Sequence, residues 1–123
     1  MRTPRPIRER RASVRVVDSL SFKIGHEDYQ TEARTLNISS HGAMCLVPSD
    51  IPMMTQLKVA FVLPFSKEAG TRTRQIKAKG VVVRKEKDVD SDRALIAIYF
   101  TQIRETDQKA LDRYIRNRLD RGR

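Results

Sequence analysis

The sequence predicts a mainly β protein: a six-stranded antiparallel β-barrel with a C-terminal α-helix and a flexible basic N-terminal arm. Three observations lead to this fold class. Apolar and polar residues alternate along most of the chain, which is the two-residue period of a half-buried strand. Short turn-like segments separate these runs without helical patterns between them, which favours an antiparallel barrel. Near the C-terminus the apolar period changes to three and four residues, which is typical of an amphipathic helix.

Size and composition limit the possible classes. A chain of 123 residues predicts one domain, which we divide into an arm at 1–15 and a barrel with its helix at 16–123. The formal net charge of +10 favours an anionic partner. No run approaches the roughly 18 apolar residues of a membrane helix, and the N-terminus shows no signal-peptide pattern. We therefore expect a cytoplasmic protein with no membrane insertion.

The predicted arm is strongly basic. Residues 1–15 contain six arginines and one glutamate. Pro4 and Pro6 disfavour a regular helix or a central strand in this segment. The pattern predicts a mobile arm, either one that reaches a ligand or a disordered, solubilising tail.

The strands follow one another along the rest of the chain. Leu20, Phe22 and Ile24 alternate with polar neighbours and predict the first strand, followed by a turn at 25–28. The other strands are expected at 30–38, 43–47, 57–63, 74–84 and 94–100, separated by a turn at 39–42, a loop between Pro48 and Pro52, a polar connection at 66–73 and a charged turn at 86–92. The last strand is almost wholly apolar, so we expect it to be covered on both faces.

The terminal helix is expected over about 105–120. Thr106 is the predicted N-cap, with Glu105 and Asp107 beside it, where acidic groups suit the helix dipole. One side of the helix carries an apolar stripe that is expected to pack on the barrel: Ala110, Leu111, Tyr114, Ile115 and Leu119.

The first candidate binding motif lies in the arm. Arg11 and Arg15 are four residues apart, so they share one side of either an extended segment or a helical turn, and Arg10 precedes them. A guanidinium group matches phosphate oxygens, pairs with the O6 and N7 edge of guanine and stacks on a base. Such a pair also arises by chance in a chain this rich in arginine, so the motif indicates a site only together with a second one.

The second motif is Asn37-Ile38-Ser39-Ser40-His41-Gly42. If Leu36 and Ile38 point into the core, Asn37 and Ser39 lie together on the outer face, where a flat ligand has room. Gly42 permits a tight turn and the close approach of a ligand, although a simple hairpin turn explains the same residues.

Together the two motifs resemble those of the PilZ domain family, bacterial receptors for the second messenger cyclic di-GMP. The family combines Arg-x-x-x-Arg in an N-terminal arm with Asp/Asn-x-Ser-x-x-Gly on a β-barrel. All five positions are matched, by Arg11, Arg15, Asn37, Ser39 and Gly42. The resemblance runs from about Arg8 to Leu119 and includes the strand at 79–84 and the helix at Arg113-Tyr114-Ile115. The chain departs from it at 94–100, where members often have a glycine, and it has no tryptophan to stack on a ligand.

The resemblance implies a PilZ-like barrel and a role for each motif. Arg11 and Arg15 would hold guanine edges and phosphates, Asn37, Ser39 and Gly42 would take another part of the nucleotide, and the arm would close over it. An extra arginine before the pair, here Arg10, implies that two mutually intercalated cyclic di-GMP molecules bind.

A few residues outside the two motifs could also take part in binding or catalysis. Arg34 and His41 are secondary ligand candidates, although a solvated turn histidine is the simpler interpretation of His41. The single cysteine, Cys45, has apolar neighbours and is expected to be a buried, inert thiol. No catalytic, phosphate-loop or metal-ligand spacing is present, so we expect no enzyme activity, no metal and no cofactor.

The sequence thus favours a cyclic di-GMP receptor or adaptor. Binding would order the arm over the barrel and create a surface for a downstream protein. Two alternatives are a basic barrel that binds RNA or single-stranded DNA, and a PilZ-like protein-interaction module that binds no nucleotide. The few aromatic residues available for base stacking make nucleic acid a weaker choice, and the intact motifs argue against the second alternative.

Overall fold

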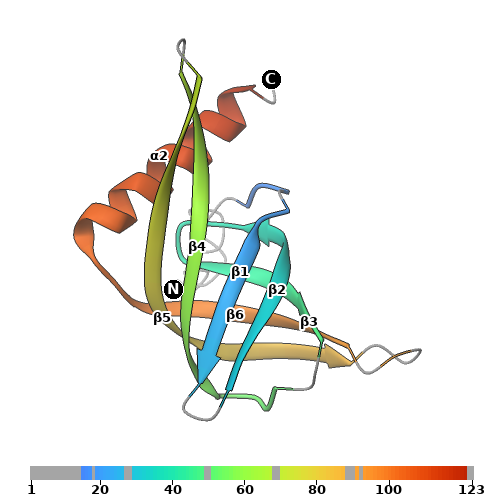
Figure 1. The fold of residues 1–123 in the computed structure, drawn as a ribbon. Helices are drawn as coiled ribbons and strands as arrows, with labels where there is room; N and C mark the ends of the chain where they lie inside the picture. Colours follow the sequence, from blue (N-terminus) through green and yellow to red (C-terminus); the bar gives the residue numbers. More distant parts are fainter. Residues whose placement is uncertain are drawn as a thin grey trace, which may run out of the picture.

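The barrel and the terminal helix are both present (Figure 1). The computed structural model describes residues 15–17, 19–26, 29–48, 51–67, 70–87, 91 and 93–121. Its elements are β1 (Ser21–His26), β2 (Tyr29–Ile38), β3 (Gly42–Val47), β4 (Gln56–Lys67), β5 (Gly70–Lys87), β6 (Ala94–Ile103) and α2 (Glu105–Arg121). The strands are all paired antiparallel and form a closed barrel in the order β1-β2-β3-β6-β5-β4. The predicted six-stranded barrel and C-terminal helix are confirmed, and residues 1–14 of the predicted arm lie outside the described residues.

The core follows from the alternating pattern. Phe22 and Ile24 are fully buried, as their period-two spacing predicts. The rings of Phe22 and Phe61 stack with centroids 4.2 Å apart, and Phe100 lies 6.1 Å from Phe61. These contacts join β1, β4 and β6 across the barrel interior, where each ring leaves water.

The hairpin of β4 and β5 is longer than expected. A polar connection was predicted over 66–73, but the two strands stay paired as far as Lys67 and Gly70. Pro64 does not end β4, because the strand stays paired with β5 there and Pro64 lies opposite Thr73. The described pairing of β1 with β4 ends at Phe61, and proline is tolerated where one edge of a strand is unpaired because it has no amide hydrogen to donate.

Two other turns are also shorter than predicted. Gly25 and His26 still pair with β2, so only the end of the expected turn separates the strands. Glu86 and Lys87, expected in a charged turn, still pair with β6. In both places the ladder extends past the apolar residues, because backbone hydrogen bonds do not require apolar side chains.

The predicted orientation of Leu36 is wrong. The β2–β3 register shifts between Thr35 and Asn37, which marks a bulge at Leu36. Thr35 points inward and is buried, Leu36 is 46% exposed, and Ile38 is again fully buried. A single extra residue therefore turns the predicted inward leucine out to solvent.

The helix begins one residue before its predicted N-cap. The amide of Gln108 donates to the carbonyl of Arg104 at 2.8 Å, so Arg104 caps the helix through its backbone and Thr106 lies in the first turn. The predicted apolar stripe does pack on the barrel core, through Ala110, Leu111, Tyr114, Ile115 and the partly buried Leu119.

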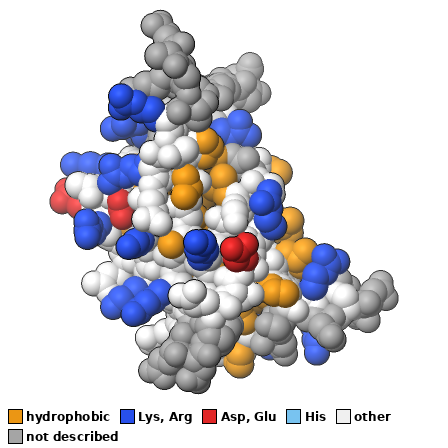
Figure 2. Space-filling model, in the orientation of Figure 1, with side chains coloured by type: hydrophobic (Ala, Val, Ile, Leu, Met, Phe, Trp, Pro, Cys, Tyr) orange, Lys and Arg blue, Asp and Glu red, His pale blue; other side chains and the backbone are white. Residues whose placement is uncertain are grey.

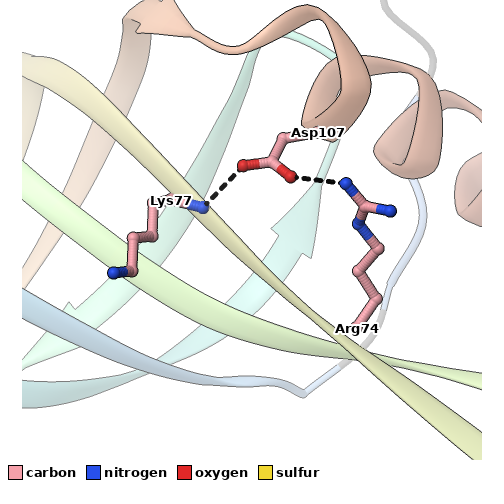
Figure 3. Close-up of polar contacts among 3 residues, drawn as sticks. All are labelled: Arg74, Lys77 and Asp107. Carbon is pink, nitrogen blue, oxygen red and sulfur yellow. Dashed lines mark hydrogen bonds and ion pairs between the residues drawn. The ribbon is translucent and has the colours of Figure 1, made fainter.

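One carboxylate fastens the start of α2 to the hairpin (Figure 3). Asp107 Oδ1 accepts from Arg74 Nη2 at 2.8 Å, and its Oδ2 accepts from the backbone amide of Lys77 at 3.4 Å. Both partners belong to β5, so this side chain fixes the helix against the strand. No helix in the described part of the chain is long and apolar enough to cross a membrane.

Candidate functional site

Arg15 and Asn37, one residue from each sequence motif, are in direct contact. Arg15 Nη1 donates to Asn37 Oδ1 at 3.1 Å, although 22 positions separate them in the chain. The backbone explains the contact: Val16 and Ile38 form an isolated antiparallel bridge, with N···O distances of 2.9 and 3.0 Å. This bridge holds the end of the arm alongside the end of β2.

The segment that follows Val16 is also attached to β2. Leu20 N donates to Thr35 Oγ1 at 2.8 Å, and Thr35 N donates to the carbonyl of Leu20 at 3.0 Å. The side chain of Arg34, a secondary ligand candidate, donates from Nε and Nη2 to Ser19 Oγ at 3.2 and 3.0 Å. The structure therefore places Arg34 against this segment rather than against Asn37.

Ser39 is not on the outer face, contrary to prediction. It is buried, at 4% exposure, at the start of the turn that joins β2 to β3. Its hydroxyl donates to the carbonyl of Gly42 at 3.3 Å and accepts from the amide of His41 at 3.2 Å, and its own amide donates to the Gly42 carbonyl at 2.8 Å. These hydrogen bonds pair the polar groups of the turn with one another, so Ser39 stabilises the conformation of the turn.

Gly42 is required for a reason that the sequence does not reveal. A Cβ atom at this position would lie 2.3 Å from the carbonyl oxygen of Ile98, on the neighbouring strand β6. The backbone shows no left-handed conformation there. The glycine therefore allows β3 and β6 to approach, and it also leaves the outer surface beside the turn free of a side chain.

The 39–42 turn is held from two further sides. The carbonyl of His41 accepts from the amide of Phe100 at 2.8 Å, and the carbonyl of Ser40 accepts from Gln108 Nε2 at 2.9 Å. Gln108 Nε2 also donates to Asp112 Oδ1 at 2.9 Å, which orients its amide group. Sequence reasoning missed Gln108, because a polar residue in the first turn of a helix carries no signal for a contact 68 positions away.

The outer surface beside Asn37 has an apolar part that the sequence motifs do not include. Asn37 pairs with Met44, and its Nδ2 lies 3.9 Å from the Met44 sulfur. Tyr99 of β6 lies directly opposite Gly42 and is 50% exposed. The hydroxyl-bearing tyrosine in an otherwise apolar strand is the one sequence signal that could have indicated this surface.

The remaining candidate residues lie in different environments. His41 is exposed on the turn. Arg10 and Arg11 lie outside the described residues. Cys45 is fully buried, as predicted, and burial raises the pKa of its thiol to about 12. Within the described ranges no three His, Cys, Asp or Glu residues are grouped to hold a metal ion.

The arrangement is suited to binding. An arginine fork, an amide and an exposed aromatic ring lie on one outer surface, beside a glycine with no side chain to block approach. Arginine has five N–H donors, and the contact with Asn37 uses one of them. Phosphate oxygens and base edges are the partners that such a set of groups accepts.

Comparisons with known proteins agree with the fold. The family model described as the PilZ domain matches residues 9–117. The solved structure of the inhibitor of motility (MotI/DgrA) from Bacillus subtilis matches 90% of this chain with 28% sequence identity and a TM-score of 0.75. This chain spans about half of that protein, 52% of its length.

A second solved structure is the PilZ domain of YcgR from Escherichia coli, determined with c-di-GMP. It matches 93% of this chain, and 95% of its own length is covered, with 14% identity and a TM-score of 0.60. At this identity the likeness shows the fold alone. A search of curated proteins finds no match.

Proposed function

Because this chain belongs to the PilZ domain family, we propose that it is a receptor for cyclic di-GMP that acts as an adaptor. The nucleotide binds where the arm meets the β2–β3 turn. Arg10, Arg11 and Arg15 contribute guanidinium groups from one side. Asn37 and the turn that ends at Gly42 form the other side.

The observation that carries this proposal is the contact between Arg15 and Asn37. One residue from each of two motifs that are distant in the sequence meets the other at one point of the surface, as a shared ligand requires. The bridge between Val16 and Ile38 is made by the backbone, so it fixes the position of Arg15 without the help of a ligand. Less conformational entropy is then lost on binding than if the whole arm had to be ordered.

Each group has a chemical role in this proposal. Arg11 and Arg15 pair with the guanine edge and the phosphates, and Asn37 offers both a donor and an acceptor. Ser39 acts by fixing the turn, since its hydroxyl is engaged within it. Tyr99 supplies an exposed ring on which a base can stack.

The signalling step follows from a difference in affinity. A ligand shifts an equilibrium only when it binds one state more tightly than the other. The nucleotide favours the arm closed over the barrel, because only that state brings all the arginines to it. The closed arm then presents a new surface to a downstream protein.

Isothermal titration with cyclic di-GMP tests the site. Arg15→Ala and Arg11→Ala should each weaken binding by about tenfold or more, as expected for the loss of a contact of roughly 1–3 kcal/mol. Arg113→Ala is the matched control, because Arg113 is exposed on α2. Unchanged affinity in both arm variants would contradict the site, and so would an equal loss in the control.

The same titration tests the number of ligands. With Arg10 in place we expect two nucleotides per chain, and Arg10→Ala should lower the number toward one. A plateau at one nucleotide in the wild type would contradict the paired ligand. Affinity for single-stranded DNA that exceeds affinity for cyclic di-GMP and falls steeply with salt would favour the nucleic-acid alternative.

A further inference from the structure

The outer face of β1, β4 and β5 carries four exposed lysines away from the nucleotide site. They are Lys23 of β1, Lys58 of β4, and Lys77 and Lys79 of β5. Ile76 and Ala78, which alternate with the two β5 lysines, are buried, so the lysines point outward. We call these four residues the lysine face.

The strand register places the four lysines in two adjacent rows. Lys58 is directly opposite Lys79. In the next row Ala60 pairs with Lys23 on one side and with Lys77 on the other. Directly opposed residues have Cβ atoms about 5 Å apart, so the ammonium groups share a small area of the sheet.

This arrangement does not favour folding. Like charges directly opposite each other destabilise a sheet. Among the described residues of the two rows, one is acidic: Glu32 of β2, which lies opposite Lys23. The row of Lys58 and Lys79 has no described acidic residue. Among the described residues, four cations therefore stand together with one acid, so this face presents a net positive charge that an anionic partner can neutralise.

The lysine face is open in the described structure. In Figure 1, β1 and β4 lie toward the viewer and α2 passes behind the β4–β5 hairpin. Figure 2 shows the same side of the molecule, with blue Lys and Arg side chains spread over it and few red acidic ones. The helix is fastened through Arg74, which lies on the other face of β5 from Lys77.

We propose that the lysine face binds an acidic segment of a partner protein. Because the face is positively charged, charge complementarity requires a partner segment with negative charge. The described residues of the two rows include no aromatic ring and no arginine, which single-stranded nucleic acids use for stacking and phosphate pairing. Ala60, which is partly buried between Lys23 and Lys77, and the exposed Val62, two positions further along β4, add apolar area beside the charges, as in a protein interface.

This surface is independent of cyclic di-GMP. The lysine face uses β1, β4 and β5, whereas the nucleotide site uses the arm and the β2–β3 turn. A partner can therefore be held here whether or not the nucleotide is bound. The test can be made on the full chain without nucleotide, so its failure would leave the receptor proposal unaffected.

The experiment measures binding of a fluorescein-labelled synthetic peptide rich in glutamate, by fluorescence anisotropy at low ionic strength. The double variant Lys58→Gln/Lys79→Gln should weaken binding by about fivefold or more, because each exposed ion pair contributes a modest amount. The double variant Arg113→Gln/Arg116→Gln removes the same charge from the exposed side of α2 and should change binding by less than about twofold.

The outcomes separate a specific surface from general attraction. A loss confined to the lysine variant, with unchanged titration of cyclic di-GMP, supports the proposal. Equal losses in the two variants would mean that only net charge matters and would overturn it. Stronger binding of an oligothymidine of equal charge, with the same loss in the lysine variant, would also overturn it in favour of nucleic acid.

Discussion

Gln108 Nε2 lies 2.9 Å from the carbonyl oxygen of Ser40, and this contact joins α2 to the turn between β2 and β3, beside the nucleotide site that we propose. Asp112 holds the same amide group from within the helix at 2.9 Å. The turn is thus positioned by a helix that contributes no residue to either sequence motif.

Gln108→Ala should weaken cyclic di-GMP binding without removing any group that touches the ligand. The turn loses one restraint, so we expect a roughly threefold to tenfold increase in Kd, equivalent to about 1 kcal/mol for one neutral hydrogen bond. Isothermal titration measures it. Lys109→Ala, on the exposed neighbouring position, should leave Kd unchanged. Equal Kd values for wild type and Gln108→Ala would show that the contact does not position the turn.

Gly42→Ala should damage the fold itself. Its Cβ would lie 2.3 Å from the Ile98 carbonyl oxygen, which belongs to the backbone and cannot rotate away. We expect a loss of about 2–3 kcal/mol in the free energy of unfolding, as for an overpacked site. Gly25→Ala is the matched control, since its nearest contact is an ordinary 3.8 Å. Denaturant unfolding compares them, and equal stability of the two variants would contradict the close approach.

Asp107→Ala should lower stability far more than Glu105→Ala. Both carboxylates lie in the first turn of α2, but their side chains are 12% and 82% exposed. Asp107 binds Arg74 at 2.8 Å, whereas Glu105 lies 3.6 Å from Lys109 on the surface. We expect losses of about 1–3 kcal/mol and less than about 0.5 kcal/mol. Thermal unfolding measures both, and similar shifts in Tm would contradict the fastening role.

Cys45 should make the fold sensitive to alkali. Burial raises the pKa of its thiol from 9.0 to about 12. The unfolded chain therefore loses this proton before the folded chain does. The associated stability is fully present below pH 9 and is lost as the pH rises toward 12, at up to about 1.4 kcal/mol per pH unit.

Cys45→Ala removes this contribution. Between pH 8 and 11 its free energy of unfolding should fall less steeply than that of the wild type, although the truncated side chain makes it less stable at neutral pH. Urea unfolding at several pH values gives both curves. Parallel curves would show that the thiol titrates equally in the folded and unfolded chains.

Much of this architecture is readable from local pattern. The alternation around Phe22 and Ile24 predicts a strand with those side chains in the core, because successive side chains of a strand point to opposite faces. The spacing of Leu111, Tyr114 and Ile115 likewise predicts the buried side of α2. The Arg-x-x-x-Arg motif and the Asn-x-Ser-x-x-Gly motif, taken together, also predict that Arg15 and Asn37 serve one site.

Other features depend on contacts that no local pattern contains. The bulge at Leu36 reversed one predicted side chain, since it depends on how β2 pairs with β3. Ser39 proved buried because the turn folds back on its hydroxyl. The strand expected to end at residue 63 continues through Pro64, because β5 stays paired with β4 beyond it.

The amino-acid sequence by itself determined the strand and helix periods, the positive charge and the residue types of the candidate binding motifs, because these are properties of short stretches of chain. Only the tertiary structure decided why Gly42 must lack a side chain, how Gln108 reaches the turn, and that Lys58 stands opposite Lys79. Each of these depends on the register or packing of segments far apart in the chain, which is fixed only when the barrel closes.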